Sequence, residues 1–73
     1  MASLKNEIRS QFKLAGFQLR LDASRHLQTL LAPLADESGE AEQWIGRIIE
    51  CLAKKNLDSG VINAQLITQA VQV

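Results

Sequence analysis

The sequence predicts an all-α fold, a four-helix domain made of two helical hairpins that pack on each other. Four stretches carry apolar residues at intervals of three and four, the spacing that places side chains on one face of a helix. The pattern of helix, short link and capped helix also occurs twice, because Leu21-Asp22 in the first half recurs as Leu57-Asp58 in the second. With 73 residues, 47% of them hydrophobic, the chain has the size of one small globular domain spanning residues 1–73.

The first helix is expected over residues 4–15. Ser3 is a suitable N-cap, and Gly16 stands just past the end, where a left-handed residue is favoured. The apolar face of this helix consists of Leu4, Ile8, Phe12 and Ala15. Residues 17–21 then alternate apolar and polar side chains, which predicts an extended connector that is too short for a sheet of its own.

The second helix is expected to begin at Asp22, because a carboxylate at that position can accept backbone N–H bonds and favours the positive end of the helix dipole. Pro33 disfavours helical geometry at Ala32, so the helix should end or kink there. Its buried stripe is predicted to contain Ala23, Leu27, Leu30 and Leu31.

The third helix has the clearest amphipathic pattern, over residues 41–55. We expect Ser38 to cap its beginning and Asn56 to stop it. Lys54 and Lys55 are placed in its last turn, where the helix dipole favours positive charge. The apolar face comprises Ala41, Trp44, Ile45, Ile48, Ile49 and Leu52.

The fourth helix is predicted to begin at Asp58 or Ser59 and to run to the end of the chain, and no charged residue follows Asp58. Its apolar face is expected to hold Ile62, Leu66, Ala70 and Val73. The two Leu-Asp links are expected to lie side by side as a minimal strand pair between the hairpin loops.

A compact monomer is predicted, since no single helix can bury its own apolar face. The core is predicted to contain Ile8, Phe12, Leu27, Leu30, Leu31, Trp44, Ile45, Ile48, Ile49, Leu52, Ile62 and Leu66. The apolar runs are far shorter than the roughly 20 residues that a membrane span needs, so we expect a soluble domain without membrane contact. Residues 1–13 lack the apolar core of a secretory signal, and the single cysteine, Cys51, allows no internal disulfide.

The sequence contains no pattern typical of a catalytic, metal or cofactor site. His26 is the only histidine and has no second ligand type at metal spacing. Cys51 has no partner base at a readable spacing, and the four glycines are too scattered to form a phosphate-binding loop. We therefore expect no catalysis by this chain alone, no metal and no cofactor.

Charge is unevenly distributed along the chain. The first 35 residues hold five basic and two acidic side chains, whereas the remainder holds three basic and six acidic ones. Lys5, Arg9 and Lys13 form a stripe at intervals of four on the first helix, and Arg20 and Arg25 follow it. These five cations are the candidate partner-binding residues. They could face nucleic-acid phosphates or an acidic protein surface, or they could form an ordinary solvated face.

The stretch 12–20, Phe-Lys-Leu-Ala-Gly-Phe-Gln-Leu-Arg, followed by Ala23 and Leu27, resembles the N-terminal domain of the B (second-largest) subunit of eukaryotic DNA polymerase epsilon. The resemblance extends over most of the chain, through Ile48-Ile49, Leu57-Asp58-Ser59 and Ala70-Val71-Gln72. The chain departs from that pattern at Phe17, where an aliphatic residue is expected, and at His26, where an aromatic residue is expected.

The resemblance implies a module like the lid domain of AAA+ ATPases, with a short parallel strand link between two helical hairpins. It also implies a non-catalytic, nuclear N-terminal module of a longer accessory subunit, which tethers the polymerase in the replisome through protein–protein interaction. The implied partners are the catalytic subunit of the polymerase and the GINS complex of the replicative helicase, with DNA contact indirect or weak. Two alternatives stay open: a small DNA-binding helical domain, and a lid fragment of a genuine AAA+ ATPase.

Overall fold

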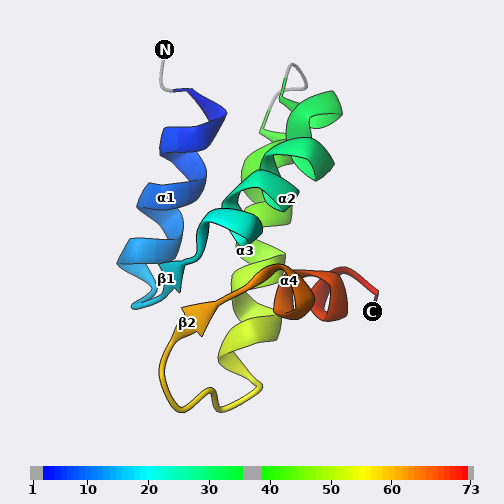
Figure 1. Cartoon of the computed structure of the whole chain (residues 1–73). Helices are drawn as coiled ribbons and strands as arrows, with labels where there is room; N and C mark the ends of the chain where they lie inside the picture. Colours follow the sequence, from blue (N-terminus) through cyan, green and yellow to red (C-terminus); the bar gives the residue numbers. More distant parts are fainter. Residues whose placement is uncertain (1–2, 36–38, 73) are drawn as a thin grey trace.

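The computed structural model describes residues 3–35 and 39–72 of the chain. Within them, four α-helices and two short strands follow one another (Figure 1). The order is α1 (Leu4–Leu14), β1 (Gln18–Leu19), α2 (Leu21–Leu31), the 3-10 helix η1 (Ala32–Leu34), α3 (Glu40–Ala53), β2 (Val61–Ile62) and α4 (Ala64–Val71). The four predicted helices and the minimal parallel strand link are confirmed. The likeness to the lid domain of AAA+ ATPases stays a prediction.

The helices pack as two neighbouring hairpins. Helix α2 contacts both α1 and α4, and α3 contacts the same two helices from the other side. In Figure 1, α1, α2 and α3 run along the length of the molecule, whereas α4 crosses near the beginning of α2. This arrangement places α1 and α2 side by side, with β1 joining them at one end (Figure 1).

Local capping explains the ends of α1 and α2. The Ser3 hydroxyl accepts the backbone N–H of Asn6 at 3.2 Å, and Gly16 adopts a left-handed φ of 85° just beyond α1, both as predicted. Helix α2 begins at Leu21, one residue earlier than expected, and Asp22 lies in its first turn. The helix ends at Leu31, as predicted, and Pro33 lies in the 3-10 turn that follows. The expected loss of helical geometry at Ala32 is wrong, because Ala32 has φ -55° and ψ -45°.

Helix α3 begins at Glu40, with Gly39 in the N-cap position at φ 79°. The predicted cap, Ser38, lies outside the described residues. Lys54 is the C-cap of α3, so the two lysines stand just past the helix and the prediction that they occupy its last turn is wrong. Asn56 has φ 55°, a left-handed conformation that asparagine tolerates better than most residues, and it stops the helix as predicted.

The strand pair lies elsewhere than predicted. Gln18 pairs with Val61 and Leu19 with Ile62 in parallel register, supported by a 2.9 Å bond from the Gln18 N–H to the Gly60 carbonyl. The Leu21-Asp22 link belongs to α2 instead, and Leu57-Asp58 precedes β2. The connection from α3 to β2 is longer than the one from α1 to β1, so the internal repeat does not mark equivalent positions in space.

Helix α4 begins at Ala64, so the prediction of a start at Asp58 or Ser59 is wrong. Asn63 is its N-cap, and the Asn63 side-chain oxygen accepts the Leu66 N–H at 2.9 Å. The β-branched residues Val61 and Ile62 favour extended backbone and pair with β1, which delays the helix until this cap.

The core connects all four helices and β2. Its fully or nearly buried apolar residues are Ile8, Phe12, Ala23, Leu27, Leu31, Ala41, Ile45, Ile48, Leu52, Ile62, Ile67 and Ala70. Two predicted core residues are wrong, because Leu30 is 39% exposed and Trp44 is 36% exposed. Ile49 and Leu66 pack at the edge of the core rather than inside it. The stripe of α3 that its neighbours cover is narrower than the sequence pattern indicates. In α4, Ile67 and Ala70 are the buried residues, and Leu66 is only partly buried.

Candidate interaction surface

The five predicted cations are all exposed, and their elements place them unequally. Lys5, Arg9 and Lys13 lie on one side of α1, away from its buried Ile8 and Phe12. The other two, Arg20 and Arg25, belong to the beginning of α2: the first is its N-cap residue and the second lies within the helix. Because α1 and α2 lie side by side, the stripe on α1 and Arg25 on α2 belong to one basic region of the surface.

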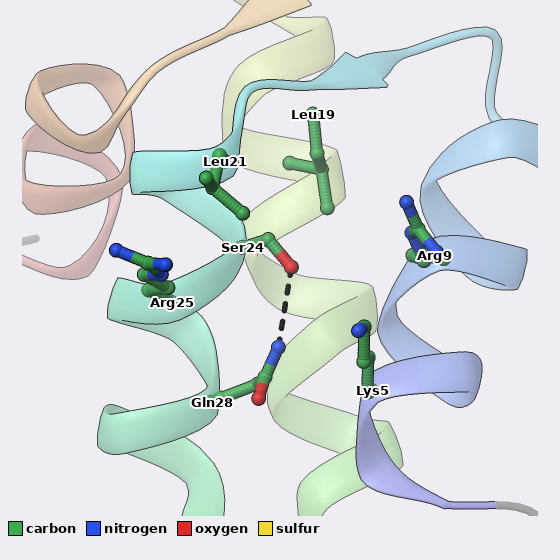
Figure 2. Close-up of a pocket in the computed structure, with 7 residues that line it drawn as sticks. All are labelled: Lys5, Arg9, Leu19, Leu21, Ser24, Arg25 and Gln28. Carbon is green, nitrogen blue, oxygen red and sulfur yellow. Dashed lines mark hydrogen bonds between the residues drawn. The ribbon is translucent and has the colours of Figure 1, made fainter.

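A hollow of about 290 Å³ lies between α1 and α2 (Figure 2). Its lining consists of Lys5, Arg9, Leu19, Leu21, Ser24, Arg25 and Gln28. Figure 2 shows Lys5 and Arg9 on the α1 side and the residues of α2 on the other, with Leu19 and Leu21 toward one end. Three of the five predicted cations thus surround one concave site.

The polar residues of α2 in this hollow hold each other in place. Ser24 is only 7% exposed and is the buried polar residue of the described chain, while Gln28 stands one helical turn later. The Gln28 side-chain amide donates a hydrogen bond to the Ser24 hydroxyl oxygen at 3.3 Å (Figure 2). This pair gives the hollow a neutral polar wall between the cations of α1 and Arg25.

Among residues 3–35 and 39–72, no acidic side chain lines the hollow. Glu7 lies on another side of α1, where its carboxylate accepts a 3.2 Å hydrogen bond from the Gln11 amide. Asp22 uses its two carboxylate oxygens to accept the backbone N–H groups of Ala23, at 2.8 Å, and Ala64, at 3.4 Å. Both acidic groups of the first 35 residues thus accept hydrogen bonds outside the lining, and the charged side chains of the described lining are all basic.

A second hollow, of about 260 Å³, continues the basic region toward the end of α1. Arg9 and Lys13 line it together with the aromatic residues Phe12 and Phe17 and with β1. Arg9 borders both hollows, whereas Arg20 lines neither. The structure therefore brings four of the five predicted cations together and leaves Arg20 apart.

Four other lining residues of the first hollow were missed at the sequence level: Leu19, Leu21, Ser24 and Gln28. The sequence did show that Ser24 and Gln28 are two polar residues four positions apart on the second helix, a spacing at which side chains can contact each other. Leu21 was readable as a leucine outside the predicted buried stripe, and in the structure it is 67% exposed. The sequence did not predict that α1 would face Ser24 and Gln28, because the packing of one helix against another is set by the tertiary structure.

The sequence singled out His26 and Cys51 as further candidates for chemistry. His26 and Cys51 are half-buried, on α2 and α3 respectively. Among residues 3–35 and 39–72, no three side chains of histidine, cysteine, aspartate or glutamate are grouped so that they could hold a metal ion. None of the described helices has the length and apolar character needed to cross a membrane.

A family model described as "DNA polymerases epsilon N terminal" matches residues 1–73. The chain belongs to this family. It is also 33% identical over 69 residues to "DNA polymerase epsilon subunit 2" of Mus musculus, which covers 94% of this chain and 13% of that relative. The chain therefore spans a small part of the curated relative that it matches. No solved structure gives a significant match. The predicted resemblance to the polymerase epsilon B subunit is confirmed.

Some of the residues that suggested the polymerase epsilon family lie in the core of the structure, and others are exposed. Phe12, Ala23 and Leu27 are buried, at 1% exposure or less. Phe17, a departure from the expected pattern, packs its ring 6.3 Å from that of Phe12 at a tilt of 57°. The family resemblance therefore includes packing residues of α1, β1 and α2, and its stretch 12–20 also holds the exposed candidate cations Lys13 and Arg20.

Proposed function

We infer that this chain is a non-catalytic interaction module of a polymerase epsilon accessory subunit, which tethers the polymerase in the replisome by binding another protein. The module forms a single domain, is monomeric in isolation, and stands at the N-terminus of a longer subunit in the nucleus. Its partners are the catalytic subunit of the polymerase and the GINS complex of the replicative helicase. Membership of the family and the match to subunit 2 of the mouse polymerase support this proposal.

The observation that carries the choice of a protein partner is the basic hollow between α1 and α2, where three cations are accompanied by two leucines. The part of the lining that the structure describes contains no aromatic side chain on which a base could stack. The whole chain also has a net charge of zero, and the acidic side chains of its second half disfavour an extended contact with a phosphate backbone. DNA contact is therefore indirect or weak in this proposal.

A likeness to the lid domain of AAA+ ATPases belongs to the same proposal, as a fold used for docking and not for nucleotide hydrolysis. The pairing of β1 with β2 between two helical hairpins supports it.

The test is a direct binding measurement. The 73-residue chain is immobilised, and purified GINS complex, polymerase epsilon catalytic subunit and duplex DNA are passed over it at physiological salt. Saturable binding of at least one of the two proteins, with weaker binding of DNA, is expected. Tight binding of duplex DNA with no binding of either protein would identify a DNA-binding domain instead.

A further inference from the structure

The hollow between α1 and α2 combines charge and apolar surface in a way that suits one class of partner. Lys5, Arg9 and Arg25 surround it, and the lining residues that the structure describes include no acidic side chain. Leu19 and the 67% exposed Leu21 provide an apolar part of the same lining. A partner that matched only the charges would leave the leucines in water, and covering them is favourable.

We propose that this hollow binds a short acidic segment of a partner protein in which an apolar residue stands between carboxylates. The carboxylates pair with Lys5, Arg9 and Arg25, and the apolar side chain rests on Leu19 and Leu21. Guanidinium groups bind carboxylates through two parallel N–H···O bonds, and the lysine adds a point charge. This inference rests on the proposed function, because it names the kind of segment that a protein partner presents to the module.

The volume of the hollow is suited to hold a few side chains of a larger partner. Its volume of about 290 Å³ is at the lower limit of small-molecule sites, which have roughly 300–1,000 Å³. All three cations and Leu21 are exposed, so the hollow is open to a segment that lies across the surface.

The geometry of α2 argues against a phosphate as the ligand. A helix N-terminus is the usual place where backbone N–H groups bind phosphate. In α2 the Asp22 carboxylate occupies this position by accepting the Ala23 N–H at 2.8 Å. The hydroxyl oxygen of the buried Ser24 already accepts a hydrogen bond from the Gln28 side-chain amide. A nucleic acid would therefore meet the three side-chain cations without the backbone donors that usually accompany them.

The test uses a peptide, acetyl-Glu-Asp-Leu-Glu-Asp-amide, titrated into the ¹⁵N-labelled 73-residue chain and followed by NMR. Saturable shifts are expected at the backbone amides of the lining residues Lys5, Arg9, Leu19, Leu21, Ser24, Arg25 and Gln28. Two matched peptides separate the two parts of the site. Replacing the acids by Gln and Asn should weaken binding about tenfold, and replacing the leucine by glycine should weaken it by about threefold or more.

Two charge-matched variants locate the binding site. R9E/R25E reverses two cations that line the hollow, and K13E/R20E reverses two exposed cations that do not. Peptide affinity should fall by about tenfold or more in the first and by less than about threefold in the second. Circular dichroism of both variants checks that the helices are retained.

Three outcomes would overturn the inference. The first is an equal loss in both variants, which would mean that only overall charge matters. The second is the absence of saturable shifts in the lining. The third is displacement of the peptide by a duplex oligonucleotide of equal charge at physiological salt, which would assign the hollow to nucleic acid.

The same variants distinguish this inference from the proposed function. If R9E/R25E still binds the GINS complex or the catalytic subunit as the unmodified chain does, the acidic-segment site is wrong and the docking function stands. If the unmodified chain binds neither protein, the proposed function is wrong whatever the peptide does.

Discussion

The carboxylate of Asp22 joins the beginning of α2 to the backbone of Ala64, the first residue of α4, although the two lie 42 positions apart in the sequence. One carboxylate oxygen accepts the Ala23 N–H at 2.8 Å, and the other accepts the Ala64 N–H at 3.4 Å. A single negative charge thus stands at the positive ends of two helices. This relationship helps to hold the two hairpins together where β1 and β2 also pair.

Replacing Asp22 by alanine should therefore lower the free energy of unfolding by about 1–2 kcal/mol, because two hydrogen bonds from backbone N–H groups at the beginnings of helices are lost. Asp22→Asn should cost less, because an amide oxygen can still accept one of the two bonds. The measurement is urea unfolding followed by circular dichroism. Asp58→Ala is the matched control, since Asp58 is exposed and lies in the bend between α3 and β2. Equal effects of the two alanine variants would contradict the bridging role.

Ile48→Ala should destabilise the chain by roughly 2–5 kcal/mol, because Ile48 is 2% exposed and lies in the core stripe of α3. A loss of this size is enough to unfold much of so small a domain at room temperature. Leu14→Ala, at a position that is 81% exposed, should change stability by less than about 0.5 kcal/mol. Thermal melting curves of the two variants provide the comparison, and an unchanged curve for Ile48→Ala would show that α3 is not central to the core.

The chain should show no saturable binding of Mg-ATP in isothermal titration calorimetry. Gly16, Gly39 and Gly60 lie in three separate turns, so no glycine-rich loop gathers backbone N–H groups around a phosphate. The described lining residues of the basic hollow also include no aromatic side chain that could stack on adenine. Micromolar affinity for Mg-ATP would contradict this prediction. It would also contradict the proposal that the lid-like fold is used for docking alone.

Reversing the α1 stripe in the variant K5E/R9E/K13E should slow association with the replication partner by about tenfold at low salt while leaving the fold intact. Charges at the rim of an interface mainly raise the association rate, and salt screens their effect. Association kinetics at several salt concentrations measure this, with circular dichroism as the folding check. The control variant K54E/K55E changes two exposed lysines beyond α3. If the association rate of K5E/R9E/K13E equals that of the unmodified chain at every salt concentration, the α1 stripe is an ordinary solvated face.

Local interactions in the sequence determined most of the helix boundaries. The hydroxyl of Ser3, the left-handed Asn56 and the ring of Pro33 each act within a few residues of their own position, so the ends that they set were predictable. The apolar stripes through Ile8 and Ile48 were also predictable, because helical spacing alone places their members on one face. The five cations were visible in the same way, as charges outside those stripes.

Tertiary structure alone decided which helix faces are buried and which residues of different segments contact each other. The parallel pairing of Gln18 with Val61 joins segments far apart in sequence, and no local pattern specifies its register. Trp44 and Leu30 lie beside buried stripes, and their exposure depends on how far a neighbouring helix extends over them. The hollow exists because α1 lies beside α2, which brings Arg9 near Ser24. Hydrogen bonding within one turn and side-chain spacing are properties of a single segment, whereas burial and concavity are properties of two segments in contact.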